Sequence, residues 1–420
     1  MNCTLKTGRI ALRLRPTLTR RLPSRLYSSS TSPSIEQQPT APEPTTPSPP
    51  QPQGSKKPRR KVIFSGIQPT GTPHLGNYLG ALREWKRLQD TSDPDTTDLF
   101  FCVVDLHALT IPKPGPELRE SREKSMAALL ALGIDPGRST LYFQSDVKEH
   151  AELAWLLSCT ASVGYLSRMT QWKSKLHLSD NATPTDLEAR QSLKLGLFSY
   201  PVLQAADILL HKATHVPVGD DQRQHLEFAR ECATNFNHVF VSSYVPKKPA
   251  QQLATMVAPE ILLPPSAAGG RIMSLTNPSK KMSKSDPSYK SRILLSDPDN
   301  VIHKKIRAAV TDSLGPVTYE PDQRPGVANL LNILSALDAK GRDPETLAKE
   351  EGLWGEDMVT LKDAVSHAVC AELEPIRERY ERWAKAPEKV REAIAESTER
   401  ARRSAEKNME AYRRVVGFGV

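Results

Sequence analysis

Two widely separated segments of the chain carry residues whose types and spacing suit phosphate chemistry. In the first, Val62 to Leu88, a short β-prone run leads into a turn with glycines at 66, 71 and 76, and helical apolar spacing follows from Leu75. Glycines let the backbone approach a ligand closely, and the N–H groups at a helix N-terminus favour phosphate. His74 and Asn77 add short polar groups that can reach a phosphate or a ribose. The segment predicts a strand, turn and helix around a nucleotide; an ordinary strand-to-helix turn is the alternative.

The second segment, Arg271 to Asp286, is a proline-bounded loop rich in mobile ammonium groups and short donors. It holds three lysines within five residues, interleaved with serines: Lys280, Lys281, Lys284, Ser283 and Ser285. Such groups suit a polyphosphate, because each ammonium is a mobile point charge with several donors. A lysine-rich surface loop that is merely solvated has the same composition.

Two further polar residues stand where ligands commonly bind. His107 closely follows the apolar run Leu99 to Val104, and open α/β sheets bind ligands at the carboxyl ends of their strands. A histidine satisfied within the core is the alternative. Asp207 lies on the apolar helix predicted over Tyr200 to Leu210, and a buried carboxylate requires a donor. A ligand ammonium, an indole N–H or a neighbouring arginine would each serve.

The elements that must position these residues predict a Rossmann-like fold. Apolar runs at 62–64, 99–104, 140–144 and 215–218 indicate buried parallel strands, a helix is expected over 117–132, and helical spacing dominates 149–200. Acids that would cap a helix or bind ribose hydroxyls follow the last strand at Gly219, Asp220 and Asp221. From residue 296 onward only helices are expected, at 300–309, 327–337, 346–350, 359–384 and 387–415. We predict an α/β fold, with a Rossmann-like parallel-sheet catalytic domain over 61–295 and an all-helical C-terminal domain over 296–420.

The formal net charge of +9 does not by itself indicate a nucleic-acid partner. Residues 1–60 hold eleven Lys and Arg and two Asp and Glu, which leaves 46 residues of each sign for 61–420. A polyanionic partner must therefore meet a local basic patch. No apolar run is long enough for a membrane span, and the five dispersed cysteines suggest neither a zinc site nor a disulfide framework.

The N-terminal residues have the composition of a targeting segment. Residues 1–30 contain seven basic residues, several Ser and Thr, and no acid, which is typical of an organelle transit peptide. Arg25 to Ser29 resembles a mitochondrial cleavage site, so the mitochondrial matrix is favoured over chloroplast import or a basic nucleic-acid arm. Residues 31–60 are rich in Pro, Ser and Thr and are expected to form a disordered linker.

Together the two phosphate-binding segments resemble the paired signatures of class I aminoacyl-tRNA synthetases. These are Pro-His-Leu-Gly-Asn at 73–77 and Lys-Met-Ser-Lys-Ser at 281–285. The motifs at 64–71, 105–110, 200–210, 216–225 and 272–275 are similar to tryptophanyl-tRNA synthetases of the bacterial and organellar type. The resemblance covers nearly the whole chain from residue 61 to the C-terminus.

The resemblance implies that ATP and tryptophan react to form an adenylate, which then passes its acyl group to tRNA(Trp). Magnesium is expected with ATP, without a dedicated protein site. The residues implied for catalysis are His74, Lys281 and Lys284. Those implied for ATP binding are Gln68, Pro69, Thr70, Gly76, Asn77, Gly219, Asp220, Asp221, Ile272, Lys281, Met282, Ser283, Lys284 and Ser285. Those implied for tryptophan binding are Asp207, Tyr200, His107, Gln68, Val216 and Val218; many relatives have Met where this chain has Gln204.

The resemblance also implies a homodimer whose C-terminal helices contact the tRNA anticodon, with no association with a membrane. Three other functions remain open at this point. A tyrosyl-tRNA synthetase has a similar fold, and a synthetase-like RNA-binding protein could keep the fold without the activity. A small-molecule adenylyltransferase could share the first turn, but it would not need the helical domain.

Overall fold

A five-stranded parallel sheet organises the computed structural model, which describes residues 60–217, 219, 222–243, 253–262 and 271–418. The strands are β1 (Lys61–Ile67), β2 (Thr97–Val103), β3 (Thr140–Phe143), β4 (His215–Pro217) and β5 (Glu260–Leu262). Their order is β3-β2-β1-β4-β5, so the chain changes direction across the sheet at β1. Ligands in such sheets bind at this switch point, beyond the carboxyl ends of the strands. The predicted Rossmann-like sheet is confirmed, and β5 was not predicted.

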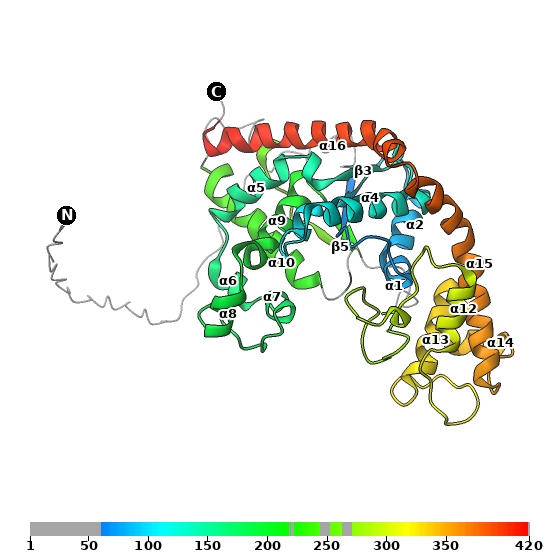
Figure 1. The fold of residues 1–420 in the computed structure, drawn as a ribbon. Coiled ribbons are helices and arrows are strands. Elements are labelled where there is room, and N and C mark those ends of the chain that lie inside the picture. The colour runs from blue at the N-terminus through cyan, green and yellow to red at the C-terminus, as the bar shows by residue number, and fades with distance from the viewer. Residues whose placement is uncertain (1–59, 218, 220–221, 244–252, 263–270, 419–420) are drawn as a thin grey trace, which may run out of the picture. The chain divides into compact units, whose positions relative to one another are not determined.

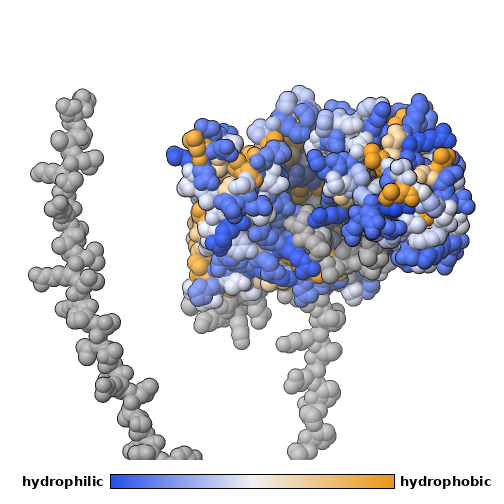
Figure 2. All heavy atoms as spheres, turned by 90° about the horizontal axis from the view of Figure 1, so that it is seen from below, coloured by the Kyte–Doolittle hydropathy of each residue, from blue (hydrophilic) through white to orange (hydrophobic). Residues whose placement is uncertain are grey.

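Both faces of the sheet are buried, which explains the continuous apolar runs in its strands. Ile63 of β1 pairs in register with Leu99 of β2, and both belong to the apolar cluster on one face. Phe64 pairs with Phe100, and both belong to the cluster on the other face. Apolar residues that remain exposed gather in patches on an otherwise polar surface (Figure 2).

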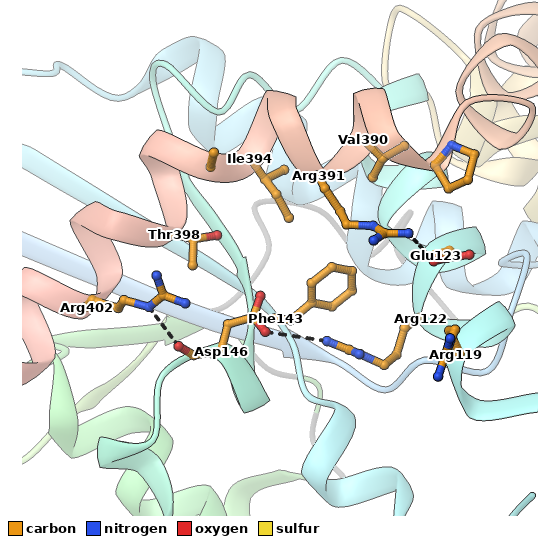
Figure 3. A pocket seen from close by; sticks show the side chains of 12 residues that line it. Arg119, Arg122, Glu123, Phe143, Asp146, Val390, Arg391, Ile394, Thr398 and Arg402 are labelled. Atoms are coloured by element: carbon orange, nitrogen blue, oxygen red, sulfur yellow. Dashed lines mark hydrogen bonds and ion pairs between the residues drawn. The ribbon is translucent and has the colours of Figure 1, made fainter. Parts of the chain in front are cut away.

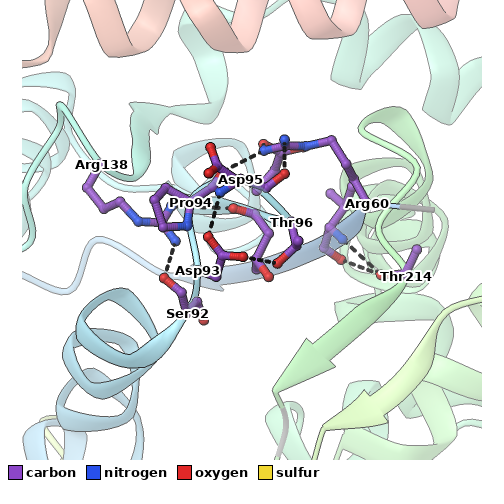
Figure 4. Close-up of polar contacts among 11 residues, drawn as sticks. Arg60, Ser92, Asp93, Pro94, Asp95, Thr96, Arg138 and Thr214 are labelled. Carbon is purple, nitrogen blue, oxygen red and sulfur yellow. Dashed lines mark hydrogen bonds and ion pairs between the residues drawn. The ribbon is translucent and has the colours of Figure 1, made fainter. Parts of the chain in front are cut away.

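The start of β1 is held by a polar cluster around Arg60. The Arg60 guanidinium donates to both carboxylate oxygens of Asp98 at 3.0 and 2.7 Å, and to the Pro94 carbonyl at 2.8 Å (Figure 4). On the other side of β1, the Thr214 hydroxyl accepts from the Val62 N–H at 2.9 Å. These bonds fix β1 between its two neighbours at the point where the described residues begin.

Helices surround the sheet in the order expected for a Rossmann-like domain. The helix predicted from Leu75 runs to residue 91, with a π-helical turn over Tyr78–Leu82 between α1 and α2. The helices of this part are α1 (Leu75–Asn77), α2 (Arg83–Thr91), α3 (Asp105–Ala108), α4 (Gly115–Ala131), α5 (Glu149–Ser158), α6 (Val163–Arg168), α7 (Gln171–Lys175), α8 (Leu187–Ser192), α9 (Leu195–Leu210) and α10 (Arg223–Phe236).

The C-terminal part is helical, as predicted. Its helices are α12 (Asp299–Arg307), α13 (Pro325–Leu337), α14 (Pro344–Glu350), α15 (Met358–Ala384) and α16 (Pro387–Val416). Helix α16 returns to the sheet (Figure 1), where the Ser397 hydroxyl accepts from the Leu141 N–H at 2.5 Å and donates to its carbonyl at 2.8 Å. Met409 and Tyr412 of α16 lie in one apolar cluster with α9 and α10. The domain boundary at residue 295 remains a prediction. The apolar clusters contain residues from both sides of it.

Candidate active site

A cleft of about 450 Å³ opens at the carboxyl ends of β1 and β4, where the strand order predicts a ligand site. The residues singled out from the sequence that line it are Gly66, Gln68, Asn77, His107, Tyr200, Gln204, Asp207, Val216, Gly219 and Lys281. Val218, Asp220 and Asp221 fall outside the described residues. The remaining predicted residues, in the turn after β1 and in the lysine-rich loop, do not line the cleft, and their roles stay predictions.

His74 holds the first turn together by capping the short helix α1. Its Nδ1 accepts from the Asn77 N–H, and the Asn77 side-chain oxygen accepts from the His74 N–H, each at 3.2 Å. Burial lowers the pKa of His74 to about 4, with smaller contributions from Lys284, Arg292 and Lys281. The imidazole is therefore neutral at neutral pH. The neutral ring positions Asn77 on the cleft, and it has no extra proton to donate as an acid.

The lysine-rich loop lies directly against this first turn. The Lys284 ammonium donates to the Thr70 carbonyl and, at 3.2 Å, to the Thr72 carbonyl. Just beyond the loop, the Ile293 carbonyl accepts from the Leu75 N–H at 2.8 Å. The two signature segments, separated by most of the catalytic part of the chain, thus form one structural unit.

Gly71 makes this close contact possible. Its φ is +85°, in the left-handed region that glycine adopts readily. A Cβ added to it would stand 2.6 Å from the Lys284 ammonium nitrogen. The glycine therefore supplies both the backbone conformation and the space for the lysine.

Buried residues anchor the lysine-rich loop to the core of the protein. Met282 and Ile272 are each 2% exposed, and the Met282 N–H donates to the Ile272 carbonyl at 2.9 Å. The Ser274 N–H donates to the Lys280 carbonyl at 2.8 Å, which completes a small hairpin. This anchoring places Lys281 on the cleft wall. The side chains of Met282 and Ile272 belong to the core, so the ATP contact implied at Ile272 would come from its backbone, and the ATP roles of both residues stay predictions.

Asp207 is 1% exposed and receives donors from three elements. His107 Nε2 lies 2.8 Å from its Oδ2, while the Gln144 amide donates to Oδ1 at 2.6 Å and His150 Nδ1 lies 2.7 Å from Oδ1. Burial alone would raise the pKa of Asp207, but the bonds from His107 and His150 outweigh it and lower the pKa to about 2. The carboxylate is therefore ionised. Its partners within the protein are histidines and an amide, not an arginine.

Tyr200 and Gln204 continue the same face of α9 along the cleft. The Tyr200 hydroxyl lies 2.6 Å from Nε2 of His225, and the Gln204 amide donates to Gln222 at 3.3 Å. The Lys175 ammonium lies 4.7 Å from the centre of the Tyr200 ring. The Gln204 side chain thus contacts the turn before α10.

Several residues of the site were missed by the sequence reasoning. Gln144 and His150 follow β3, at the same sheet edge as His107, so the carboxyl-end rule that identified His107 would have indicated them too. Lys175 and Gln171 come from the short helix α7, and nothing in their local sequence pointed to the cleft.

A second cleft, between α4, β3 and α16, contains none of the predicted site residues (Figure 3). Three of its arginines, Arg122, Arg391 and Arg402, are bound within the protein. Arg122 lies 2.6 Å from Asp105 and stacks over Phe143, and Arg391 lies 3.2 Å from Glu123. This cleft is a place where α16 is clamped to the sheet.

Among the described residues, no group of three or more His, Cys, Asp or Glu side chains could hold a metal ion. Within the same part of the chain, no helix combines the length and apolar character needed to cross a membrane.

Comparison with known proteins identifies the family. The model of tRNA synthetases class I (W and Y) matches residues 56–374. The mitochondrial tryptophan–tRNA ligase of Schizosaccharomyces pombe is 45% identical over 363 residues, covering 85% of this chain and 96% of that protein. The one from Saccharomyces cerevisiae is 43% identical over 363 residues, covering 85% and 91%.

Solved structures agree with this result. Tryptophanyl-tRNA synthetase from Mycoplasma pneumoniae superposes with a TM-score of 0.71 at 32% identity, covering 86% of this chain and 98% of that one. The Campylobacter jejuni enzyme complexed with ADP and tryptophan gives 0.66 at 30% identity, covering 85% and 99%. The chain therefore belongs to the class I tRNA synthetases of the tryptophan and tyrosine group.

Proposed function

We propose that this protein attaches L-tryptophan to tRNA(Trp) in an ATP-dependent reaction that passes through tryptophanyl-adenylate. Relatives named as tryptophan–tRNA ligases support the overall reaction. The observation that carries the proposal is one cleft whose wall includes Asn77 and Lys281 from the two phosphate-binding segments and the buried carboxylate of Asp207.

In the first step a carboxylate oxygen of tryptophan attacks the α-phosphorus of ATP, and the bond to pyrophosphate breaks. The protein aligns the reactants and stabilises charge, and it forms no covalent bond. Lys281 on the cleft and Lys284 beside the turn supply positive charge for the departing pyrophosphate. Gln68, Asn77 and Gly219 line the nucleotide end of the cleft.

Selection of tryptophan follows from the way Asp207 is bonded. An ionised carboxylate has about four acceptor positions. His107, His150 and Gln144 occupy three of them, and the fourth is on Oδ2. An indole N–H in the cleft is suited to this position. Amino acids that place no donor there leave a buried charge partly unpaired, which strongly disfavours them.

Magnesium enters with ATP in this proposal. Mg²⁺ is commonly held by substrate phosphates and a few waters, so it needs no cage of protein ligands. Bound there, it would neutralise charge on the polyphosphate. In the second step the terminal ribose hydroxyl of tRNA attacks the adenylate carbonyl carbon, and AMP leaves. The C-terminal helices would contact the anticodon.

Charging of tRNA tests the proposal. Purified protein starting at Pro58 should attach labelled tryptophan to mitochondrial tRNA(Trp) when ATP and Mg²⁺ are present, and should not charge tRNA(Tyr) with tyrosine. Charging with tyrosine in place of tryptophan would assign the protein to the other half of its family. Tight binding of tRNA without charging would favour an RNA-binding role.

We further infer that the protein is a homodimer. A shallow apolar groove lies between α3, α5 and α9 and reaches Tyr200 of the cleft. Leu109, which follows α3 and lines the groove, is 50% exposed, and Trp155 of α5 and Leu195 of α9, outside the groove, are 69 and 79% exposed. Exposed apolar residues near such a groove are typical of an interface. Trp155→Glu should convert the dimer to monomers in light scattering, whereas a monomeric wild type would contradict the inference.

Import into the mitochondrial matrix is the remaining proposal. It is supported by relatives named as mitochondrial and by the arginine-rich, acid-free composition of residues 1–30. Residues 1–60 fused to a fluorescent protein should direct it to the matrix. Replacing the arginines of residues 1–30 with glutamine should leave it in the cytosol, and matrix import of that variant would contradict the proposal.

A further inference from the structure

A chain of polar side chains, buried except for the half-buried Ser404 at its end, runs from Asp207 away from the cleft to helix α16. His150 contacts Asp207 through Nδ1 at 2.7 Å, and the Tyr142 hydroxyl lies 3.1 Å from Nε2 of His150. The same hydroxyl lies 2.9 Å from Nε2 of His211, whose Nδ1 is 3.1 Å from the Ser404 hydroxyl. His150 and Tyr142 are fully buried, and His211 is 3% exposed. We call these four residues, His150, Tyr142, His211 and Ser404, the relay.

The hydrogens of the relay are correlated, because each link holds one hydrogen. A neutral His150 that donates from Nδ1 to Asp207 must accept at Nε2 from Tyr142. Tyr142 then accepts from His211, and His211 accepts from Ser404. Burial lowers the pKa of His211 well below its ordinary value, so this ring carries a single hydrogen. The relay therefore satisfies every nitrogen and hydroxyl along it in one direction.

Burying the polar side chains of the relay costs free energy, and packing alone does not require polar side chains at these positions. It crosses an apolar cluster, and the His211 ring lies 4.3 Å from the Phe100 ring in a stacked arrangement. Apolar side chains of similar volume would fill this space without desolvating polar groups. A fully satisfied network instead fixes the orientation of its members. Tyr142, His211 and Ser404 do not line the cleft, and their hydrogen-bonded path to Asp207 runs through His150.

We propose that Tyr142, His211 and Ser404 are positioning residues for tryptophan activation, which hold His150 so that Asp207 keeps its free acceptor position turned toward the cleft. This inference rests on the proposed function, because it takes Asp207 as the contact for tryptophan. It extends the amino-acid site from α9 through β3 to α16, a helix distant in sequence.

The test is the effect of Tyr142→Phe on tryptophan-dependent exchange of pyrophosphate into ATP. Phenylalanine keeps the buried ring and removes the hydroxyl. We expect the KM for tryptophan to rise about tenfold, the typical effect of losing support for a charged hydrogen-bond partner, while kcat and the KM for ATP stay within about twofold. Ser404→Ala should raise the KM for tryptophan about threefold, and Ser404→Thr, which restores the hydroxyl, should behave as wild type.

A matched control is Tyr412→Phe. The Tyr412 hydroxyl is also buried and donates to the Leu209 carbonyl of α9 at 3.1 Å, but it lies outside the relay. Its loss should leave the KM for tryptophan unchanged. A spectroscopic check is available through ¹⁵N-labelled histidine, because the Nδ1 hydrogen of His150 should lose its fixed position in Tyr142→Phe.

The following outcomes would overturn the proposal that the relay positions His150. An unchanged KM for tryptophan in Tyr142→Phe, or a fall in kcat alone, would mean that the hydroxyl serves only folding. If Tyr142→Phe does not fold, the Ser404 pair decides: equal KM values for Ser404→Ala and Ser404→Thr would overturn the relay. A wild type that does not activate tryptophan would instead refute the proposed function.

Discussion

Lys284 has an ammonium group in surroundings that disfavour its charge. Burial lowers its pKa to about 8, and Arg292, Lys124 and Lys113 add to the shift. Between about 8 and 10.5 the folded protein therefore binds fewer protons at Lys284 than the unfolded chain does, so stability rises as the pH increases through this window. At neutral pH the charged lysine weakens the fold, which is expected of a residue retained for its chemistry.

We expect Lys284→Ala to separate folding from catalysis. Its free energy of unfolding at pH 7 should stay within about 1 kcal/mol of wild type, because a disfavoured charge is removed together with two bonds to carbonyls. Adenylate formation should fall by about 100- to 1,000-fold, the usual effect of losing a charge that stabilises the transition state. Urea unfolding and pyrophosphate exchange measure the two quantities. Wild-type exchange in this variant would show that Lys284 does not act on pyrophosphate.

The pH profile gives an independent prediction. The value of kcat/KM for ATP reports groups of the free enzyme, so it should decline above pH 8 as Lys284 loses its proton. Lys284→Arg keeps its charge throughout this range and should move the decline to higher pH. A wild-type profile that stays flat to the alkaline limit of stability would contradict this assignment.

Asp207 shows how far a single sequence can define a site. An acid on an apolar helix predicts a buried carboxylate that needs donors, and the structure contains one. The donors themselves lie 57, 63 and 100 residues away along the chain, at His150, Gln144 and His107. Such pairings depend on how the strands are ordered in the sheet, which hydrophobic periodicity does not report. The sequence therefore indicated the acid and left its partners open.

At the level of elements, strand prediction succeeded where an apolar run was continuous. The runs that became β1, β2 and β3 are rich in buried apolar residues, and the three-residue β4 was indicated by its β-prone sequence. Strand β5 has only three residues, Glu260–Leu262, preceded by Pro259, and its sequence is that of a loop. It becomes a strand because β4 offers an edge to pair with. Pairing with β4 therefore makes these residues a strand, although their local sequence does not predict one.

The glycine turn offers a prediction with a matched control. Gly71 and Gly315 both have a positive φ, at +85° and +96°, so alanine at either position costs about 1 kcal/mol of backbone strain. Only at Gly71 would the new Cβ meet Lys284, since nothing lies within 4 Å at Gly315. Gly71→Ala should therefore reduce pyrophosphate exchange strongly, and Gly315→Ala should only lower stability. Equal exchange rates would show that the contact between turn and loop is not needed for activation.

For the whole molecule, the helical pattern after residue 296 was predicted and its packing was not. Two links join α16 to the sheet and to α5: the bonds of Ser397 to Leu141, and the pairing of Arg413 with Glu152 at 2.5 Å. Further contacts join α15 to the first turn, where Tyr380 and Thr72 hydroxyls lie 2.7 Å apart. Periodicity identifies the apolar face of a helix, but it does not say which part of the protein that face covers.

Removing α16 tests this packing. A chain that ends at Ala386 would uncover the apolar residues that Met409 and Tyr412 now bury, so it should be unstable and prone to aggregation. An independent helical domain would instead allow the shortened chain to fold and to activate tryptophan normally. Circular dichroism and pyrophosphate exchange distinguish the two results. Normal exchange would support the predicted boundary at residue 295 as a structural one.

The central claim is that two phosphate-binding segments and one buried carboxylate act on the same pair of substrates. Amino-acid-dependent exchange of pyrophosphate into ATP, measured for the chain from Pro58 with each of the twenty amino acids, tests it most directly. The account predicts exchange with tryptophan alone, and its loss in both Lys284→Ala and Asp207→Ala. Exchange with tyrosine in place of tryptophan, or exchange that survives both substitutions, would contradict it.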